Sequence, residues 1–220
     1  MALTAALFGL ACERPAHAAA GDLPKPATDL PRPKDNADAV AYFAGGCFWC
    51  TEAVFEQLAG VKDVVSGYSG GAKETANYHA VCNGDTGHAE TIKVTYDPSR
   101  ITYGDLLRVF FTTHNPTTKN RQGNDTGTQY RSAIFYQNDD EKKVAEAYIK
   151  QLNDAKAFDK PIVTTLEPYK AFYRAEDYHQ DFARLNPNQG YIRAIALPKV
   201  QKVFEHFQDQ VKKPEEQEKK

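Results

Sequence analysis

The sequence has no surplus of either charge and no long apolar run. Its 220 residues carry 27 basic and 29 acidic side chains, which gives a formal net charge of −2. Nucleic-acid-binding proteins usually gather a basic surplus on one face, so this balance offers no support for such a partner. No stretch reaches the roughly 18 to 20 consecutive apolar residues that a membrane-spanning helix requires. Hydrophobic residues at 41% and charged residues at 25% match an ordinary globular protein.

Methionine and cysteine are both scarce. Met1 is the only methionine, and the chain has four cysteines. Cys12 lies in an N-terminal segment that we expect to be removed, which leaves Cys47, Cys50 and Cys82. An odd number excludes a framework in which every cysteine is paired within one chain. These cysteines therefore need an explanation other than purely structural disulfides.

Residues 1–20 are typical of a secretory signal peptide. Residues 2–12 are mostly small and apolar, and Ala-His-Ala at 16–18 has the A-x-A form of a cleavage site. A basic segment before the apolar stretch is missing. Lipid attachment at Cys12 and an N-terminal tail of a cytoplasmic protein are the two alternatives. We expect a periplasmic or secreted protein.

The remaining chain is predicted to hold one folded domain, and we expect a monomer. Residues 21–37 contain four prolines among charged residues, which is typical of an extended linker. Residues 209–220 are mostly charged and are predicted to form a flexible tail. The folded domain is therefore expected at 38–208.

The hydrophobic pattern predicts an α+β fold. Alternation along 89–96 places Ile92, Val94 and Tyr96 on one face, as in a strand with one buried side. The order of elements is strand, helix, strand, strand, helix, strand, which is the split β-α-β pattern of a ferredoxin-like two-layer sandwich. Those six elements are expected at 39–44, 48–58, 61–68, 89–96, 103–114 and 130–136, with a helical turn near 78, a helix at 140–155, a strand at 162–166, and helices near 177–185 and 198–210.

Two cysteines stand at a predicted strand-to-helix turn. The run reads Gly45-Gly46-Cys47-Phe48-Trp49-Cys50, and Cys47 opens the helix. The N–H groups and positive partial charge of a helix N-terminus favour a thiolate, which is the nucleophilic form of cysteine. Cys50 follows one helical turn later, near enough for a disulfide with Cys47. The pattern indicates a reactive thiol with a second thiol in reach.

Two non-catalytic interpretations compete with this one. The cysteines could be small buried hydrophobic residues, although a Gly-Gly-Cys turn is a poor core site. They could also bind zinc together with His88, in a zinc-stabilised interaction module. The spacing of Cys82 and His88 lacks the usual form of a zinc ligand pair, which weighs against this hypothesis.

Two other catalytic classes share part of this pattern. A thioredoxin-like dithiol also has Cys-x-x-Cys, but here the tryptophan lies between the cysteines rather than ahead of them. A papain-like cysteine hydrolase would use Cys47 with His179, and Asn186 and Asn188 follow that histidine. The local signature of that class fails, because Cys50 is followed by Thr51 and not by an aromatic residue.

The run Gly46–Trp49 resembles the active-site motif of the A-type peptide methionine sulfoxide reductases. The resemblance continues in the family's order from about Tyr42 to Gln180. It departs at Asn115, where the family commonly has aspartate before the proline. The other matching blocks are Gly67-Tyr68-Ser69-Gly70-Gly71, Asn77-Tyr78, Gly87-His88-Ala89-Glu90, Tyr96-Asp97-Pro98, His114-Asn115-Pro116-Thr117, Gln122-Gly123-Asn124-Asp125, Gly127-Thr128-Gln129-Tyr130-Arg131-Ser132 and Ala175-Glu176-Asp177-Tyr178-His179-Gln180.

The resemblance implies thiol-dependent reduction of methionine S-sulfoxide, free or in proteins, and thus the repair of oxidised proteins. It implies that Cys47 is the nucleophile and that Glu90 protonates the sulfoxide oxygen. It further implies that Tyr78 and Tyr130 hydrogen-bond that oxygen and that Asp125 orders the polar groups around it. A carboxyl group can donate a proton near neutral pH only if its pKa is raised, usually by burial. The start of an alternating strand is a suitable place for such a buried Glu90.

The resemblance also assigns the surroundings of the substrate. Phe48 and Trp49 match the apolar wall around the methyl group. Gly46 belongs to the same motif, and His88 is a substrate-site candidate that could instead support its loop. His179 is interpreted as structural.

A second thiol must capture the sulfenic acid that Cys47 would form. Family members often carry this resolving cysteine near the C-terminus, whereas this sequence has no cysteine after Cys82. Cys50 is the expected resolving residue and Cys82 the alternative. The resemblance implies that a thioredoxin-like dithiol reduces the disulfide, and no bound cofactor or metal is expected.

Overall fold

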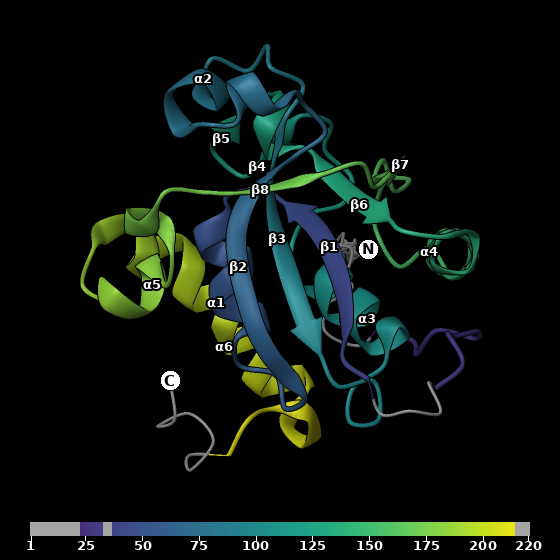
Figure 1. Cartoon of the computed structure of the whole chain (residues 1–220). Coiled ribbons are helices and arrows are strands. Elements are labelled where there is room, and N and C mark those ends of the chain that lie inside the picture. The colour runs from purple at the N-terminus through teal and green to yellow at the C-terminus, as the bar shows by residue number, and fades with distance from the viewer. Residues whose placement is uncertain (1–22, 33–36, 214–220) are drawn as a thin grey trace, which may run out of the picture.

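The computed structural model describes residues 23–32 and 37–213 (Figure 1). Its centre is a six-stranded sheet in the order β7-β6-β1-β3-β2-β8. All neighbouring strands are antiparallel except β6 and β7, which run parallel. The strands of this sheet are β1 (Ala39–Gly45), β2 (Val61–Ser69), β3 (Ala89–Tyr96), β6 (Ser132–Tyr136), β7 (Thr165–Pro168) and β8 (Phe172–Arg174).

The inner four strands confirm the predicted ferredoxin-like α+β topology. Their spatial order is β6-β1-β3-β2, so β3 lies between β1 and β2 and is antiparallel to both. Helix α1 (Phe48–Phe55) connects β1 to β2, and α3 (Tyr103–Thr113) follows β3. This interleaving of strands is the split β-α-β arrangement. The remaining α-helices are α2 (Tyr78–Cys82), α4 (Asp139–Asp154), α5 (Phe182–Leu185) and α6 (Leu197–His206).

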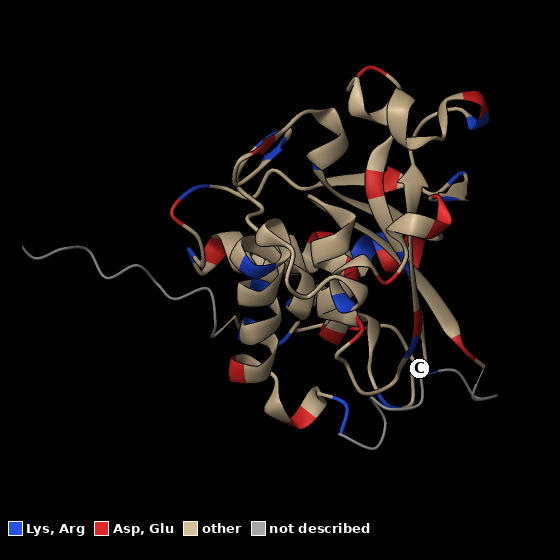
Figure 2. Cartoon of the chain, turned by 90° about the vertical axis from the view of Figure 1, so that its left-hand side faces the viewer, with Lys and Arg blue, Asp and Glu red and all other residues tan. Residues whose placement is uncertain are grey.

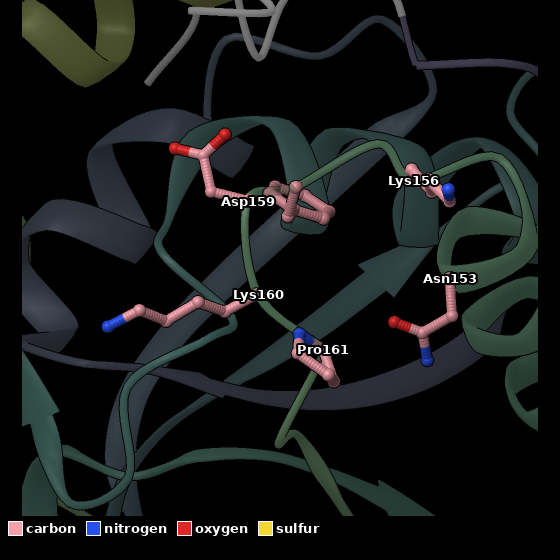
Figure 3. A pocket seen from close by; sticks show the side chains of 6 residues that line it. Asn153, Lys156, Asp159, Lys160 and Pro161 are labelled. Carbon is pink, nitrogen blue, oxygen red and sulfur yellow. The ribbon is translucent and has the colours of Figure 1, made fainter.

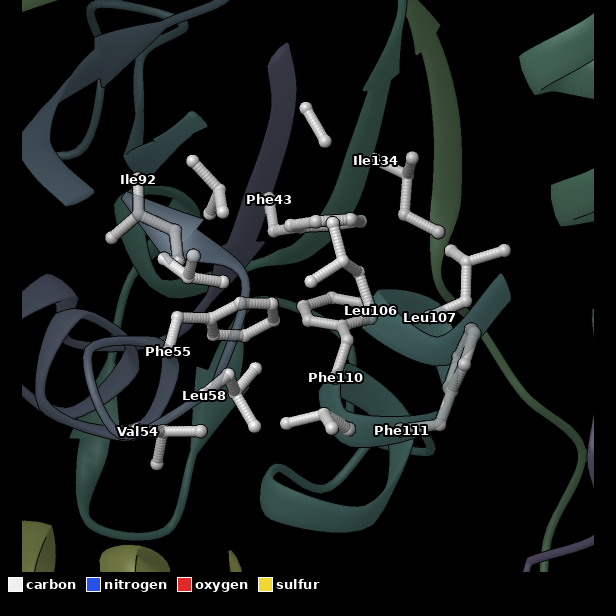
Figure 4. Packing of buried hydrophobic residues seen from close by; sticks show 14 of the residues in the cluster. Phe43, Val54, Phe55, Leu58, Ile92, Leu106, Leu107, Phe110, Phe111 and Ile134 are labelled. Carbon is white, nitrogen blue, oxygen red and sulfur yellow. The ribbon is translucent and has the colours of Figure 1, made fainter. Parts of the chain in front are cut away.

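Stacked aromatic rings and aliphatic side chains fill the core between the sheet and its helices (Figure 4). Phe43 of β1 stacks against Phe55 of α1 and Phe110 of α3, with ring centroids 5.4 and 5.2 Å apart. Ile92 and Val94 of β3 are fully buried beside them. Since neighbouring residues of a strand face opposite sides, this packing fixes which side of β3 faces the helices.

A smaller cluster covers the other face of the sheet. Tyr42 points away from Phe43 and stacks on Tyr169 with ring centroids 4.3 Å apart. The chain between β7 and β8 crosses the sheet here, and Figure 1 shows it running over the ends of the inner strands. Phe172 at the start of β8 completes the cluster.

The strand predicted at 162–166 begins later than expected, at Thr165. The backbone N–H of Ile162 instead donates to Asn153 Oδ1 at 3.0 Å, and that of Val163 donates to the carbonyl of Pro116 at 2.8 Å. These residues are therefore held by α4 and by the loop at Pro116 rather than by a neighbouring strand.

The helix predicted near 177–185 is divided. A 3₁₀ helix covers Asp177–His179, and α5 begins only at Phe182. Asp181 between them has a left-handed φ of 53°, which interrupts an α-helix. The helix predicted near 198 starts earlier as a π-helix over Ile192–Ala196, which continues directly into α6.

Residues 23–32 are extended, as a proline-rich segment should be, but they pack on the domain. Leu23 is buried in the core, and its carbonyl accepts a hydrogen bond from Arg108 Nε at 2.7 Å. The Tyr148 hydroxyl donates to the carbonyl of Pro24, and the Gly104 N–H donates to Asp29 Oδ1, both at 2.8 Å. The segment is therefore a strap across α3 and α4.

Both ends of the chain extend beyond what the structure describes. The expected signal peptide at 1–20 lies outside the described residues, as does the end of the expected tail at 214–220. At the C-terminal side the fold continues to Val211, which pairs with Leu58. Within 23–32 and 37–213, no helix is long and apolar enough to cross a membrane.

Candidate active site

The turn between β1 and α1 places Cys47 at the start of the helix. Gly46 has a left-handed φ of 92°, and a Cβ atom there would lie 2.5 Å from Cγ of Gln122. Cys47 is the N-cap residue of α1, and its carbonyl accepts hydrogen bonds from the N–H groups of Cys50 and Thr51. Only glycine allows both this turn and the close approach of Gln122.

Replacing Gly46 by alanine is expected to lower the free energy of unfolding by about 1–3 kcal/mol through backbone strain alone. Displacement of Gln122 should add to this loss and disturb Cys47. Gly123→Ala is the matched control, because Gly123 also has a positive φ, of 60°, but a Cβ atom added there would meet no described atom within 4 Å. Urea unfolding of both variants measures the difference, and equal losses would contradict a role for the contact with Gln122.

Cys47 and Cys50 form a hydrogen-bonded pair of thiols. Cys47 is 7% exposed and Cys50 has no exposed surface. Burial raises the pKa of Cys47, and its hydrogen bond with Cys50 acts in the same direction. That hydrogen bond lowers the pKa of Cys50 to about 7, with help from the charge of Lys199 and from Tyr191. The position of Cys47 at the helix start favoured a thiolate on that residue; in the free chain, burial outweighs that effect.

Glu90 lies in β3, directly beside the start of α1. Its Oε2 accepts a hydrogen bond from the backbone N–H of Phe48 at 2.9 Å. The side chain is 2% exposed, and burial raises its pKa to about 8, although the hydrogen bond from Phe48 opposes the shift. The carboxyl group is therefore mostly protonated at neutral pH, as an acid that donates to a substrate oxygen must be.

Tyr78 and Tyr130 come from separate segments and meet near this carboxyl group. Tyr78 opens α2, and Tyr130 ends the 3₁₀ helix Thr128–Tyr130. Burial raises the pKa of both hydroxyls, and the hydrogen bond with Cys82 raises that of Tyr78 further. Both tyrosines therefore keep their protons and can donate hydrogen bonds at this place.

Glu176 holds Tyr78 in place, a role that was not predicted from the sequence. Its Oε1 accepts from the backbone N–H of Tyr78 and its Oε2 accepts from the Tyr68 hydroxyl, both at 2.9 Å. Glu176 lies inside one of the blocks that resemble the family, so the resemblance could have indicated a role for it.

Asp125 and Tyr191 form a second polar pair at the site. Asp125 lies in the short hairpin of β4 (Arg121–Gln122) and β5 (Asp125–Thr126). The Tyr191 hydroxyl donates to Asp125 Oδ2 at 2.5 Å and lies 3.9 Å from Cys50 Sγ. Tyr191 was not predicted as a site residue from the sequence, because it lies outside every block that resembles the family.

Aromatic rings form the apolar side of the site. Trp49 stacks on Phe182 of α5 with ring centroids 3.9 Å apart, and its Nε1 donates to His179 Nδ1 at 3.1 Å. Phe48 is buried beneath these rings and contacts His179 and Tyr68. Trp49 is the more exposed of the two predicted wall residues, so it is better placed to meet a substrate.

His88 is placed to support its loop rather than to contact a substrate. Its Nδ1 accepts from the N–H of Gly71 at 3.2 Å, and its Nε2 bonds to the carbonyl of Ala72 at 2.9 Å. Both ring nitrogens are therefore engaged by the backbone. This arrangement removes His88 from the zinc hypothesis as well, and the described ranges contain no group of three metal-ligating side chains.

His179 is not placed to act as the base of a hydrolase. Its Nδ1 accepts the indole hydrogen of Trp49, so its proton must reside on Nε2. Nε2 is buried and has no hydrogen-bond partner among the residues that the structure describes. A base needs a free lone pair directed at the nucleophile, so this geometry does not support the pair of Cys47 and His179.

Cys82 differs from the other two cysteines. It ends α2 and is exposed, and it shares a hydrogen bond with the Tyr78 hydroxyl. Cys82 lies at the rim of the site and bonds to Tyr78, whereas Cys50 is hydrogen-bonded to Cys47 directly.

Two hollows on the described surface differ in how near they lie to the Cys47–Cys50 pair, called here the sulfur site. One of about 190 Å³ is lined by the loop 122–125 together with Tyr191, Ile195 and Lys199, and it adjoins Cys50 through Tyr191. The other lies between the end of α4 and β7 (Figure 3), where Asp159 and Lys160 extend away from Asn153. None of the residues that line the second hollow belongs to the sulfur site.

Charged residues are mixed over the side of the molecule shown in Figure 2. Blue and red segments are interspersed over the ribbon in this view. Lys199, which influences Cys50, is one of the basic residues of α6.

Comparisons with known proteins show the family of this chain. The family model "Peptide methionine sulfoxide reductase" matches residues 39–212. The peptide methionine sulfoxide reductase MsrA of Deinococcus radiodurans is 51% identical over 80% of this chain and 85% of its own length, and MsrA 1 of Rhodopirellula baltica is 52% identical over 80% and 90%.

Solved structures give the same result. Reduced Mxr1 of Saccharomyces cerevisiae has a TM-score of 0.63 at 35% identity, covering 72% of this chain and 91% of its own. Methionine sulfoxide reductase A of Corynebacterium diphtheriae has a TM-score of 0.61 at 32% identity, covering 73% and 84%. The chain belongs to the peptide methionine sulfoxide reductase family and is an oxidoreductase.

Proposed function

We propose that this chain reduces methionine S-sulfoxide, in proteins or as the free amino acid, through a sulfenic acid on Cys47. One observation carries the proposal: Cys47 begins α1 next to a buried carboxyl group, Glu90, which hydrogen-bonds the following residue, Phe48. A nucleophile and a protonated acid thus stand side by side.

The first step transfers the sulfoxide oxygen to Cys47. Glu90 donates a proton to that oxygen while the Cys47 sulfur attacks the sulfoxide sulfur, and Tyr78 and Tyr130 donate hydrogen bonds to the same oxygen. The methyl group lies against Trp49. Net, one thiol and one sulfoxide give one sulfenic acid and one thioether, so no proton is gained or lost and Glu90 is restored.

The second step joins Cys47 to Cys50. In the reduced chain the hydrogen bond with Cys47 lowers the pKa of Cys50 to about 7, and the charge of Lys199 and the contact with Tyr191, which do not depend on the Cys47 thiol, act in the same direction. The thiolate attacks the sulfenic acid sulfur and the S–O bond breaks. The departing hydroxide takes up a proton and leaves as water.

An external dithiol of the thioredoxin type then reduces the disulfide. We propose that this occurs in the periplasm or outside the cell, on the basis of the apolar N-terminal segment. In such a compartment disulfides persist unless a dedicated reductant acts on them. Sequencing of the mature N-terminus tests the location, because a protein that retains residue 2 would contradict removal of a signal peptide.

Substrate stereochemistry gives a direct test of the function. A peptide with methionine S-sulfoxide should be reduced, whereas the R-sulfoxide should present its methyl group and oxygen to the wrong sides of the site. We expect a preference of at least about 100-fold for the S form, since loss of a positioned hydrogen bond and of the acid each affect the rate. Separate assays of the two diastereomers measure it, and equal rates would contradict the proposal.

A further inference from the structure

The two sulfurs of the proposed disulfide differ in accessibility. Cys47 is at the N-cap of α1 and keeps 7% of its surface exposed, while Cys50 lies inside the helix with none. Cys50 belongs to a buried cluster with Ile192 and Ala196 of the π-helix, and Tyr191 packs over it. Both cysteines belong to one buried cluster, and Cys47 is the less enclosed residue of the two by its exposed surface.

The surroundings of Cys50 are those of a good leaving group. In thiol–disulfide exchange the sulfur that departs leaves as a thiolate, and it leaves faster when its pKa is lower. In the reduced chain the Cys50 thiol donates to the Tyr191 hydroxyl at 3.9 Å, and this hydroxyl can donate to a Cys50 thiolate when it turns away from Asp125. The positive charge of Lys199 also favours the thiolate of Cys50. Around Cys47, burial, the hydrogen bond with Cys50 and the charge of Glu90 act against a thiolate and outweigh the opposite effect of Tyr191 on its pKa.

We propose that the external dithiol attacks the sulfur of Cys47, so that the mixed disulfide forms on Cys47 and Cys50 departs, with Tyr191 and Lys199 as positioning residues for the departing sulfur. The reductant thiolate forms a bond to Cys47 Sγ, the Cys47–Cys50 bond breaks, and its electron pair stays on Cys50. The second thiol of the reductant then displaces Cys47, which takes up a proton. This inference rests on the proposed function, since it requires the disulfide of Cys47 and Cys50.

The attacked sulfur can be identified by trapping. The full chain with Cys82→Ser is pre-reduced, given one equivalent of methionine-S-sulfoxide peptide, and mapped for the Cys47–Cys50 disulfide. A thioredoxin whose second active-site cysteine is serine is then added, the reaction is quenched with acid within seconds, and free thiols are alkylated. Fragmentation of the peptide between Phe48 and Trp49 shows which cysteine carries the conjugate.

We expect the conjugate on Cys47 and the alkyl label on Cys50. A conjugate on Cys50 overturns the inference and leaves the proposed function intact. An intact disulfide that forms no conjugate also overturns it, since the inference requires the sulfur of Cys47 to react. If the disulfide is absent before thioredoxin is added, the second step of the proposed function has failed and the inference falls with it.

The positioning residues have their own test. Tyr191→Phe keeps the ring and removes the hydroxyl, and the loss of one hydrogen bond should slow reduction of the disulfide by dithiothreitol about three- to tenfold. The pKa of Cys50, followed by thiolate absorbance of the reduced Cys82→Ser chain, should rise. Lys199→Gln should act in the same direction, with an effect that shrinks at high salt. An unchanged Cys50 titration in both variants contradicts this part of the inference, because a purely structural effect would not move it.

Discussion

Replacing Glu90 by glutamine should lower the rate of methionine formation about 10²–10⁴-fold, the usual contribution of general acid catalysis. Glutamine matches glutamate in shape, but it has no acidic proton to give to the sulfoxide oxygen. Its amide can still accept the hydrogen bond from Phe48, so the start of α1 should keep its geometry. Single-turnover kinetics of the pre-reduced protein measure the loss at the chemical step.

The single-turnover rate should also depend on pH through the protonation of Glu90. Burial raises the pKa of Glu90 to about 8, so the active, protonated form is present below that pH and is lost as the pH rises through it. The wild-type single-turnover rate should therefore fall above about pH 8. That limb should vanish in Glu90→Gln.

Glu74→Gln is the matched control for Glu90, because it makes the same chemical change at an exposed position. It should leave both the rate and the pH profile unchanged. Near-wild-type activity of Glu90→Gln would remove Glu90 from the mechanism, and a persisting alkaline limb would assign that titration to another group.

Replacing Cys50 by serine should separate the two halves of the reaction. Cys47 can still accept the oxygen, so about one methionine per chain should form, after which thioredoxin-driven turnover should fall to the background rate. The sulfenic acid should then accumulate on Cys47, where a cyclic 1,3-diketone can label it. A burst assay measures the methionine formed per chain, and mass spectrometry of the same sample measures the labelled sulfenic acid on Cys47.

Cys82→Ser is the control for Cys50→Ser. Cys82 is exposed and bonded to Tyr78, so its loss should leave the disulfide and the turnover in place. Full thioredoxin-driven turnover in Cys50→Ser, together with its loss in Cys82→Ser, would move the resolving role to Cys82.

Once the family resemblance had selected Glu90 and Cys47, local pattern was sufficient to predict the burial of Glu90 and the turn before Cys47. Residues of β3 with even numbers face the helices, so the alternation that buries Ile92 and Val94 also buries Glu90. The glycines before Cys47 indicated a tight turn into a helix, and the φ of Gly46 has the value such a turn needs. Both predictions needed only neighbouring residues, which is why they succeeded.

Contacts between distant segments could not be predicted in the same way. Tyr191 reaches Cys50 and Asp125 because a π-helix follows it and packs on α1. Nothing in the sequence of residues 192–196 distinguishes a π-helix from an α-helix. Strand β8 has three residues and exists because Gly67 of β2 allows the ring of Phe172 to lie against it. Such features depend on tertiary packing rather than on local propensity.

The break in the chain before α5 also depends on contacts with a distant segment. The side chain of Gln180 donates to the carbonyls of Ser66 and Ala175 and accepts from the N–H of Ser66. This anchors the chain to β2 and forces the left-handed turn at Asp181. A periodic pattern predicts a helix through this point, because the competing partner is more than 100 positions away in the sequence.

One measurement tests the central claim most directly: single-turnover reduction of a methionine-S-sulfoxide peptide by the pre-reduced protein, without added reductant, followed by a thiol count and disulfide mapping. The account predicts about one methionine per chain, about two thiols lost, and a disulfide between Cys47 and Cys50. No methionine with all thiols unchanged would contradict the reductase chemistry at Cys47. Methionine formed with a disulfide between Cys47 and Cys82 would keep that chemistry and contradict the role of Cys50.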